Sequence, residues 1–203
     1  MTWGKLRIHP GFFLLLAVMF LLDTGGLLFW IGWAALLHEG GHLFALYLCG
    51  GQLDRLELSL LGCNLVVKSG LSYPKDLLCC LAGPVASVIG AGAAGRMGLY
   101  ALAGFSLTLG LFNLLPLPTL DGGRLVVLFL QWRWASRYLW IADTVALTCA
   151  AAISGWGLVL FIRTRYNITL LVSGIYALLN VTGGCYVRKN RIHSARQIGR
   201  AHV

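Results

Sequence analysis

Two histidines and a glutamate stand in an otherwise apolar part of the chain, in the segment LHEGGHL at 37–43. On an α-helix, His38 and His42 lie one turn apart and project from nearly the same side, so both imidazoles can bind one metal ion. H-E-x-x-H on a helix is a zinc motif in which the glutamate, here Glu39, is the general base. The alternative, a pair of structural core histidines, is disfavoured because ionisable groups within apolar membrane segments are by default functional.

A catalytic zinc ion takes three protein ligands and keeps one position open. The pattern that supplies a third histidine from the same segment is excluded, because its glycine and histidine positions are Ala45 and Leu48. Asp121 is the best remaining carboxylate, since a proline-broken segment precedes it and two glycines that allow close backbone approach follow it. Asp143 is the rival ligand, although its place near the start of an apolar helix also suits an acidic side chain without a metal.

The chain that carries these residues has the composition of an integral membrane protein. Of its 203 residues, 58% are hydrophobic and 11% are charged, and its mean hydropathy is +0.79. Soluble domains have roughly 25% charged residues. Because a spanning helix needs about 20 apolar residues, we expect about six, at approximately 10–22, 25–49, 77–95, 98–115, 139–162 and 168–187.

Two connections between these segments are predicted not to be helical. Residues 52–68 partly alternate polar and apolar side chains, which predicts a short membrane-associated β-hairpin. Its edge would accept an extended substrate as an added strand, or the hairpin would be an interfacial amphipathic element; both interpretations stay open. Pro116 and Pro118 forbid a regular helix in the other connection. The predicted fold class is therefore an all-α polytopic membrane protein with about six transmembrane helices and a short hairpin.

The net charge of +9 comes from cations that flank the apolar segments. Because no basic stretch is interleaved with aromatic residues, nucleic acid is not an expected partner. If the number of spans is even, both termini lie on the same side of the membrane, and 13 of the 16 Lys and Arg residues then lie on that side. The positive-inside rule then predicts a multi-pass cell-membrane protein with both termini in the cytoplasm. The six cysteines lack metal-knuckle spacing and are expected to be inert thiols rather than disulfides.

Three motifs in this order resemble those of the site-2 intramembrane metalloproteases. They are HEGGH at 38–42, LAGP at 81–84, and N-x-x-P at 113–116 followed by LDGG at 120–123. Within that family, the compact layout is similar to the sporulation stage IV factor B type, which processes a membrane-associated precursor of a sigma factor. That type carries a nucleotide-sensing domain after the last span, whereas here an intramembrane protease domain (1–187) is followed by a basic cytoplasmic tail (188–203). No soluble peptide-binding domain follows the hairpin.

The resemblance implies both an activity and a set of site residues. The activity is zinc-dependent hydrolysis of a peptide bond in or near a transmembrane segment, as in the regulated intramembrane proteolysis of a sigma-factor precursor or an anti-sigma factor. The site residues it implies are the zinc ligands His38, His42 and Asp121, the general base Glu39, and the substrate-binding residues Asn113 and Pro116. From the residues alone, Asn113 would equally serve as a helix C-terminal cap.

The expected partners are a membrane-bound protein substrate and the lipid bilayer, with an inhibitory membrane partner as a further candidate. A membrane metal transporter is one alternative, disfavoured because the intramembrane acidic residues cluster with a single motif. An inactive client-binding protein is another, disfavoured because Glu39 is intact.

Overall fold

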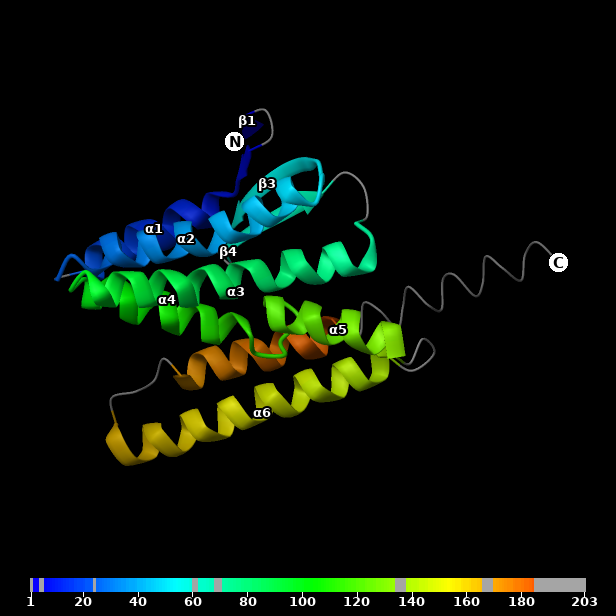
Figure 1. Cartoon of the computed structure of the whole chain (residues 1–203). Helices are drawn as coiled ribbons and strands as arrows, with labels where there is room; N and C mark the ends of the chain where they lie inside the picture. Colours follow the sequence, from blue (N-terminus) through cyan, green and yellow to red (C-terminus); the bar gives the residue numbers. More distant parts are fainter. Residues whose placement is uncertain are drawn as a thin grey trace. The chain divides into compact units, whose positions relative to one another are not determined.

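The chain is described by a computed structural model that covers residues 2–3, 6–23, 25–59, 62–67, 71–133, 138–165 and 170–184. It is mostly helical (Figure 1). It divides into two compact units, Met1–Leu114 and Leu115–Val203. The predicted basic tail at 188–203 lies outside the described residues.

The described part of the first unit contains the helices α1 (Pro10–Leu22), α2 (Leu27–Leu48), α3 (Tyr73–Arg96) and α4 (Tyr100–Asn113). Helices α2, α3 and α4 pack against one another (Figure 1). Small residues permit this packing: a Cβ added at Gly41 would lie 2.6 Å from the Cβ of Ala86, and one at Gly110 would lie 2.8 Å from the Cβ of Ser87. Helix backbones approach closely at such small residues.

Helix α2 begins at a side-chain cap. The Asp23 carboxylate accepts hydrogen bonds from the backbone N–H groups of Leu27 at 2.8 Å and Leu28 at 2.9 Å. Such bonds satisfy N–H groups that the first turn of a helix cannot pair. The bond from Leu28, followed by that from Leu27, lowers the pKa of Asp23 below its ordinary value. The capping carboxylate therefore fixes the start of the helix that carries the two histidines.

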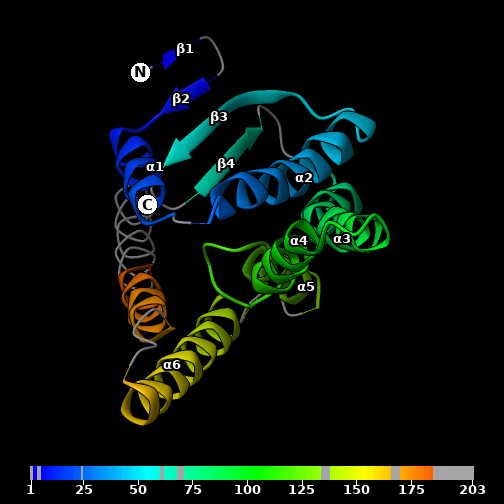
Figure 2. The same ribbon diagram turned by 90° about the vertical axis from the view of Figure 1, so that its left-hand side faces the viewer.

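A four-stranded sheet belongs to the same unit (Figure 2). Its strands, in spatial order, are β1 (Thr2–Trp3), β2 (Leu6–Ile8), β3 (Leu53–Ser59) and β4 (Gly62–Val67). Strands β3 and β4 are antiparallel, with Leu56 opposite Leu65, which confirms the predicted hairpin. Strand β2 pairs parallel to β3, with Leu6 opposite Leu56. Strands β1 and β2 were not predicted from the sequence, because strands of two or three residues are too short to show alternation.

The described part of the second unit contains α5 (Asp121–Arg133), α6 (Tyr138–Thr164) and a shorter apolar helix, Leu170–Gly184. Its buried core joins the loop before α5 to the last two helices through Leu117, Ala146, Ala150 and Val181. Helix α5 was not predicted from the sequence, which indicated a non-helical connection before the next apolar segment. The structure instead makes Asp121 the first residue of this helix, which is too short and too polar to have the pattern of a span.

Two described helices are long and apolar enough to cross a membrane, Tyr73–Arg96 and Tyr138–Thr164. Shorter apolar helices occupy Pro10–Leu21, Tyr100–Asn113 and Leu170–Gly184. The helical character of the predicted fold is thus confirmed, while the count of six spans stays a prediction. The cysteines at 49, 79, 80 and 149 are free thiols.

Candidate metal centre

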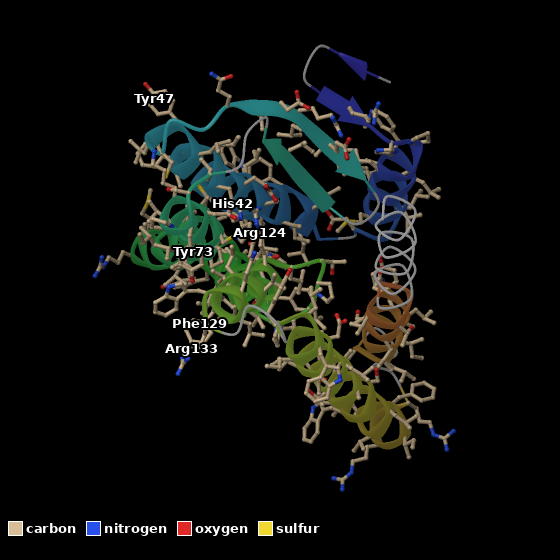
Figure 3. The ribbon with its side chains drawn as sticks, turned by 90° about the vertical axis from the view of Figure 1, so that its right-hand side faces the viewer. His42, Tyr47, Tyr73, Arg124, Phe129 and Arg133 are labelled. Atoms are coloured by element: carbon tan, nitrogen blue, oxygen red, sulfur yellow. The ribbon has the colours of Figure 1, made fainter. Side chains whose placement is uncertain are left out.

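The two histidines of the HEGGH segment meet on one side of α2. The Nε2 atoms of His38 and His42 lie 3.3 Å apart, and the ring planes are inclined by 80° with centroids 4.9 Å apart. His38 is buried and His42 is half-buried; Figure 3 shows the His42 side chain near its helix. The structure therefore brings together the two imidazoles whose one-turn spacing predicted a shared ligand.

The other nitrogen of each ring contacts α3. His42 Nδ1 lies 2.7 Å from the carbonyl oxygen of Cys79. A carbonyl oxygen only accepts hydrogen bonds, so Nδ1–H of His42 donates, and the lone pair of the neutral ring is on Nε2. His38 Nδ1 lies 2.9 Å from Ser87 Oγ. Both Nδ1 atoms thus have partners on α3, and both Nε2 atoms face each other.

This arrangement fits a tetrahedral metal ion. Zinc binds histidine nitrogen at about 2.0–2.1 Å, so two nitrogen ligands of one tetrahedral zinc ion lie about 3.3 Å apart. The Nε2 atoms of His38 and His42 have this separation. Ligating histidines usually donate their second N–H to a carbonyl, carboxylate or water, as His42 donates to Cys79. The donor set and its surroundings therefore suit zinc.

Two glycines make room for the histidines. A Cβ added at Gly83 would overlap the His42 ring, with Cε1 only 2.5 Å away. A Cβ at Gly41 would lie 2.5 Å from the carbonyl oxygen of Ala82. By contrast, nothing lies within 4 Å of a Cβ added at Gly40. The glycine in LAGP and the second glycine in HEGGH thus allow α2 and α3 to approach closely around the His42 ring.

The other predicted catalytic residues of the first unit lie on α2 and α4. Glu39 is half-buried and follows His38 directly, so it points about 100° around the helix axis from that histidine. Asn113 is the last residue of α4, and its Nδ2 donates to the carbonyl oxygen of Leu109 at 3.0 Å. The C-cap residue of this helix is Leu114. A role for Asn113 in substrate binding stays a prediction.

The remaining predicted residues belong to the second unit. Asp121 begins α5, and the two glycines after it are buried. Pro116 and the rival ligand Asp143 line one cavity of about 240 Å³, together with Arg124 and apolar residues of α5 and α6. Arg124, a residue of α5, is labelled in Figure 3. The choice of Asp121 over Asp143 as the third ligand stays a prediction.

Ser87 and Cys79 were not predicted from the sequence as partners of the histidines. Neither residue has a side chain that would single it out in an apolar span. Only their spacing indicated a shared role: Cys79, Gly83 and Ser87 recur every fourth residue and therefore share one face of α3.

Known proteins share both sequence and fold with this chain. Residues 73–153 match Peptidase family M50. The "Regulator of sigma E protease" of Haemophilus influenzae is 40% identical over 85 residues, which are 40% of this chain and 18% of that protein. "Protease RseP" of Photorhabdus luminescens is 35% identical over 103 residues, which are 47% of this chain and 42% of that protein. The chain thus spans less than half the length of either relative.

The fold is similar to that of a solved structure, the site-2 protease from Methanocaldococcus jannaschii. The TM-score is 0.67, with 22% sequence identity, and the match covers 90% of this chain and 92% of the other. This likeness extends the comparison beyond the residues that the family match covers.

Proposed function

We propose that this chain belongs to the site-2 protease family and is an intramembrane zinc metalloprotease. The family match and the sequence relatives support this assignment, and the fold agrees with it. It hydrolyses a peptide bond in or near a transmembrane segment of a membrane-bound protein. The observation that carries the proposal is the pair of Nε2 atoms 3.3 Å apart on an apolar helix, with Glu39 next to His38 in sequence.

The proposed zinc ligands are His38, His42 and Asp121. Support for Asp121 comes from its place at the start of α5, directly after the proline-containing turn and before two buried glycines. When bound, zinc supplies a water of lowered pKa, near 7 in known enzymes, and polarises the peptide carbonyl.

Glu39 is the proposed general base. Its carboxylate takes a proton from the attacking water and delivers that proton to the nitrogen of the leaving amine. Glu39 is suited to this task rather than to binding the metal, because its direction differs from that of the two histidines by about a quarter turn. Asn113 and Pro116 are the proposed substrate-binding residues. The role of Pro116 is supported by its place in the wall of a cavity.

The substrate must present an extended segment, because a helix hides its backbone carbonyls in its own hydrogen bonds. We place that segment along β4, which among the described strands pairs only with β3. An extended peptide adds to such an edge through main-chain hydrogen bonds. If the hairpin is instead an interfacial element, substitutions on β4 will change membrane attachment rather than cleavage.

We further propose about six spans with both termini in the cytoplasm. This topology is supported by the 13 of 16 cations that it places on one side and by the two long and three shorter apolar helices. A narrower proposal, cleavage of a sigma-factor precursor or an anti-sigma factor, is supported by the name of one relative, "Regulator of sigma E protease". The resemblance to the sporulation type stays a prediction.

The proposal is tested with the purified chain in lipid vesicles, incubated with single-span candidate precursors. The products are mapped by mass spectrometry. Glu39→Gln keeps the size of the side chain but removes the base, so we expect zinc to stay bound while cleavage falls about 10²–10⁴-fold. Cleavage by Glu39→Gln at the wild-type rate would refute the mechanism. Transport of zinc across the vesicle membrane without any cleavage of the precursors would favour a transporter.

A further inference from the structure

One face of α3 holds both imidazoles. Cys79, Gly83 and Ser87 follow one another at four-residue spacing on this helix, and all three are buried. The first provides a carbonyl oxygen to His42, the second leaves space for the His42 ring, and the third contacts His38. Of these two contacts on α3, the one to His38 comes from a side chain and the one to His42 from the backbone, so a substitution can remove the contact to His38 alone.

The contact between Ser87 and His38 is enclosed. Ser87 is 0% exposed and His38 is 3% exposed, so water does not replace the hydroxyl if it is lost. A serine hydroxyl both donates and accepts hydrogen bonds. At 2.9 Å, its oxygen is therefore able to accept Nδ1–H from a neutral His38 ring.

The position of that proton decides whether the histidine pair can bind a metal ion. A neutral imidazole carries one N–H, and the partners of the two nitrogens select the tautomer. If His38 carried its proton on Nε2, this N–H would lie 3.3 Å from the Nε2 lone pair of His42. A hydrogen bond between the two rings would then occupy both ligand atoms.

We propose that Ser87 is a positioning residue for the metal centre: its hydroxyl accepts Nδ1–H from His38 and so keeps the Nε2 lone pair available to the ion. This inference rests on the proposed zinc site at His38 and His42. It assigns Ser87 a task that packing alone would not require.

The variants are Ser87→Ala, which removes the acceptor, and Ser87→Cys, which replaces it by a larger and weaker one. The matched control is Ser106→Ala in α4. Ser106 is also 0% exposed, but among the described residues its hydroxyl has no hydrogen-bond partner. A loss caused only by a disturbed helix interior should therefore appear in the control as well.

The first measurement is ¹⁵N-histidine NMR of the metal-free full chain in detergent, with the His38 signals identified by their absence in His38→Ala. We expect the Nδ1–H tautomer of His38 in the wild-type chain and in Ser106→Ala. In Ser87→Ala we expect a shift toward Nε2–H. The Nε2–H tautomer in the wild-type chain, or an unchanged tautomer in Ser87→Ala, would overturn the proposal.

The second measurement is zinc affinity by competition with a chelating dye. Loss of a second-shell partner typically costs 10–100-fold in metal affinity, so we expect Ser87→Ala to bind zinc about 10–100-fold more weakly. Ser87→Cys should lie between Ala and wild type, and Ser106→Ala should match wild type. Equal losses in Ser87→Ala and Ser106→Ala, or weaker binding by the larger Cys than by Ala, would show a packing role and overturn the inference. A wild-type chain that binds no zinc would refute the proposed function, while the NMR experiment still tests Ser87.

Discussion

Replacing Gly83 by alanine should disable the metal centre without touching a ligand. The added Cβ would overlap the ring of His42, with Cε1 at 2.5 Å and Cδ2 at 2.7 Å. Carbon atoms in van der Waals contact are about 3.5–4.0 Å apart, so the ring or the helix must move by about 1 Å. That movement acts against the hydrogen bond of 2.7 Å from His42 to the carbonyl oxygen of Cys79.

Two opposing effects set the size of the change. Alanine is favoured over glycine within a helix by about 0.8–1.0 kcal/mol, whereas overpacking a tight site costs about 1–3 kcal/mol. The net effect on the stability of the fold should thus be small, on the order of 0–2 kcal/mol. The effect on activity should be larger, since a misplacement of about 1 Å in a catalytic site can cost about 10²-fold.

The matched control is Gly92→Ala on the same helix, where nothing lies within 4 Å of the added Cβ. Zinc content, thermal unfolding in detergent and cleavage of a single-span precursor are measured for both variants. We expect wild-type zinc binding and cleavage in Gly92→Ala, and weakened zinc binding with a loss of cleavage of about 10²-fold in Gly83→Ala. If Gly83→Ala retains full zinc affinity and activity, the close fit of α3 around His42 is not required and the reasoning fails.

Three further predictions concern the third ligand, the packing of α2 and the sheet. Asp121→Ala should abolish stoichiometric zinc binding in elemental analysis while Asp143→Ala retains it; the reverse result would transfer the third-ligand role to Asp143. Gly41→Ala should lower the free energy of unfolding by on the order of 0–2 kcal/mol, because overpacking outweighs the helix preference of alanine. Gly40→Ala, which meets nothing within 4 Å, should leave it equal or higher; similar losses in both would contradict the close contact with α3. In the sheet, the hydrogen bond from Arg55 at 2.7 Å and then the charges of Arg55 and Arg7 lower the pKa of Glu57. Because the folded-state pKa is the lower one, the contribution of these ion pairs is present above the ordinary value of about 4.3 and is lost as the pH falls through the folded-state value. Amide exchange in β2 and β3 should therefore show a loss of protection in acid that is absent from Glu57→Gln, and an identical pH response in that variant would exclude Glu57 as its cause.

The periodicity of regular structure made several features predictable from the sequence. The four-residue spacing of His38 and His42 places both rings on one side of any helix, so their meeting needed no knowledge of the rest of the chain. The alternation in 52–68 likewise predicted a hairpin, because side chains of a strand change face at every residue. In each case the interacting residues are near neighbours in sequence, so the local pattern of residues is sufficient to predict the structure.

Contacts between distant segments had no such pattern. Ser87 reaches His38 across 49 residues of sequence, and β2 joins β3 with Arg7 opposite Glu57, 50 residues away. Helix α5 was also not predicted, because a short helix with a polar first turn lacks the long apolar run by which a span is identified. These features depend on which surfaces fit together when helices pack. Glycines such as Gly41 and Gly83 permit that fit because they have no side chain where the neighbouring helix approaches. The sequence by itself thus determined that the imidazoles of His38 and His42 lie on one side of a helix and that the chain is rich in apolar segments. Only the packing of α2 against α3 decided which atoms contact the two rings, because that depends on distances between backbone segments that are far apart along the chain.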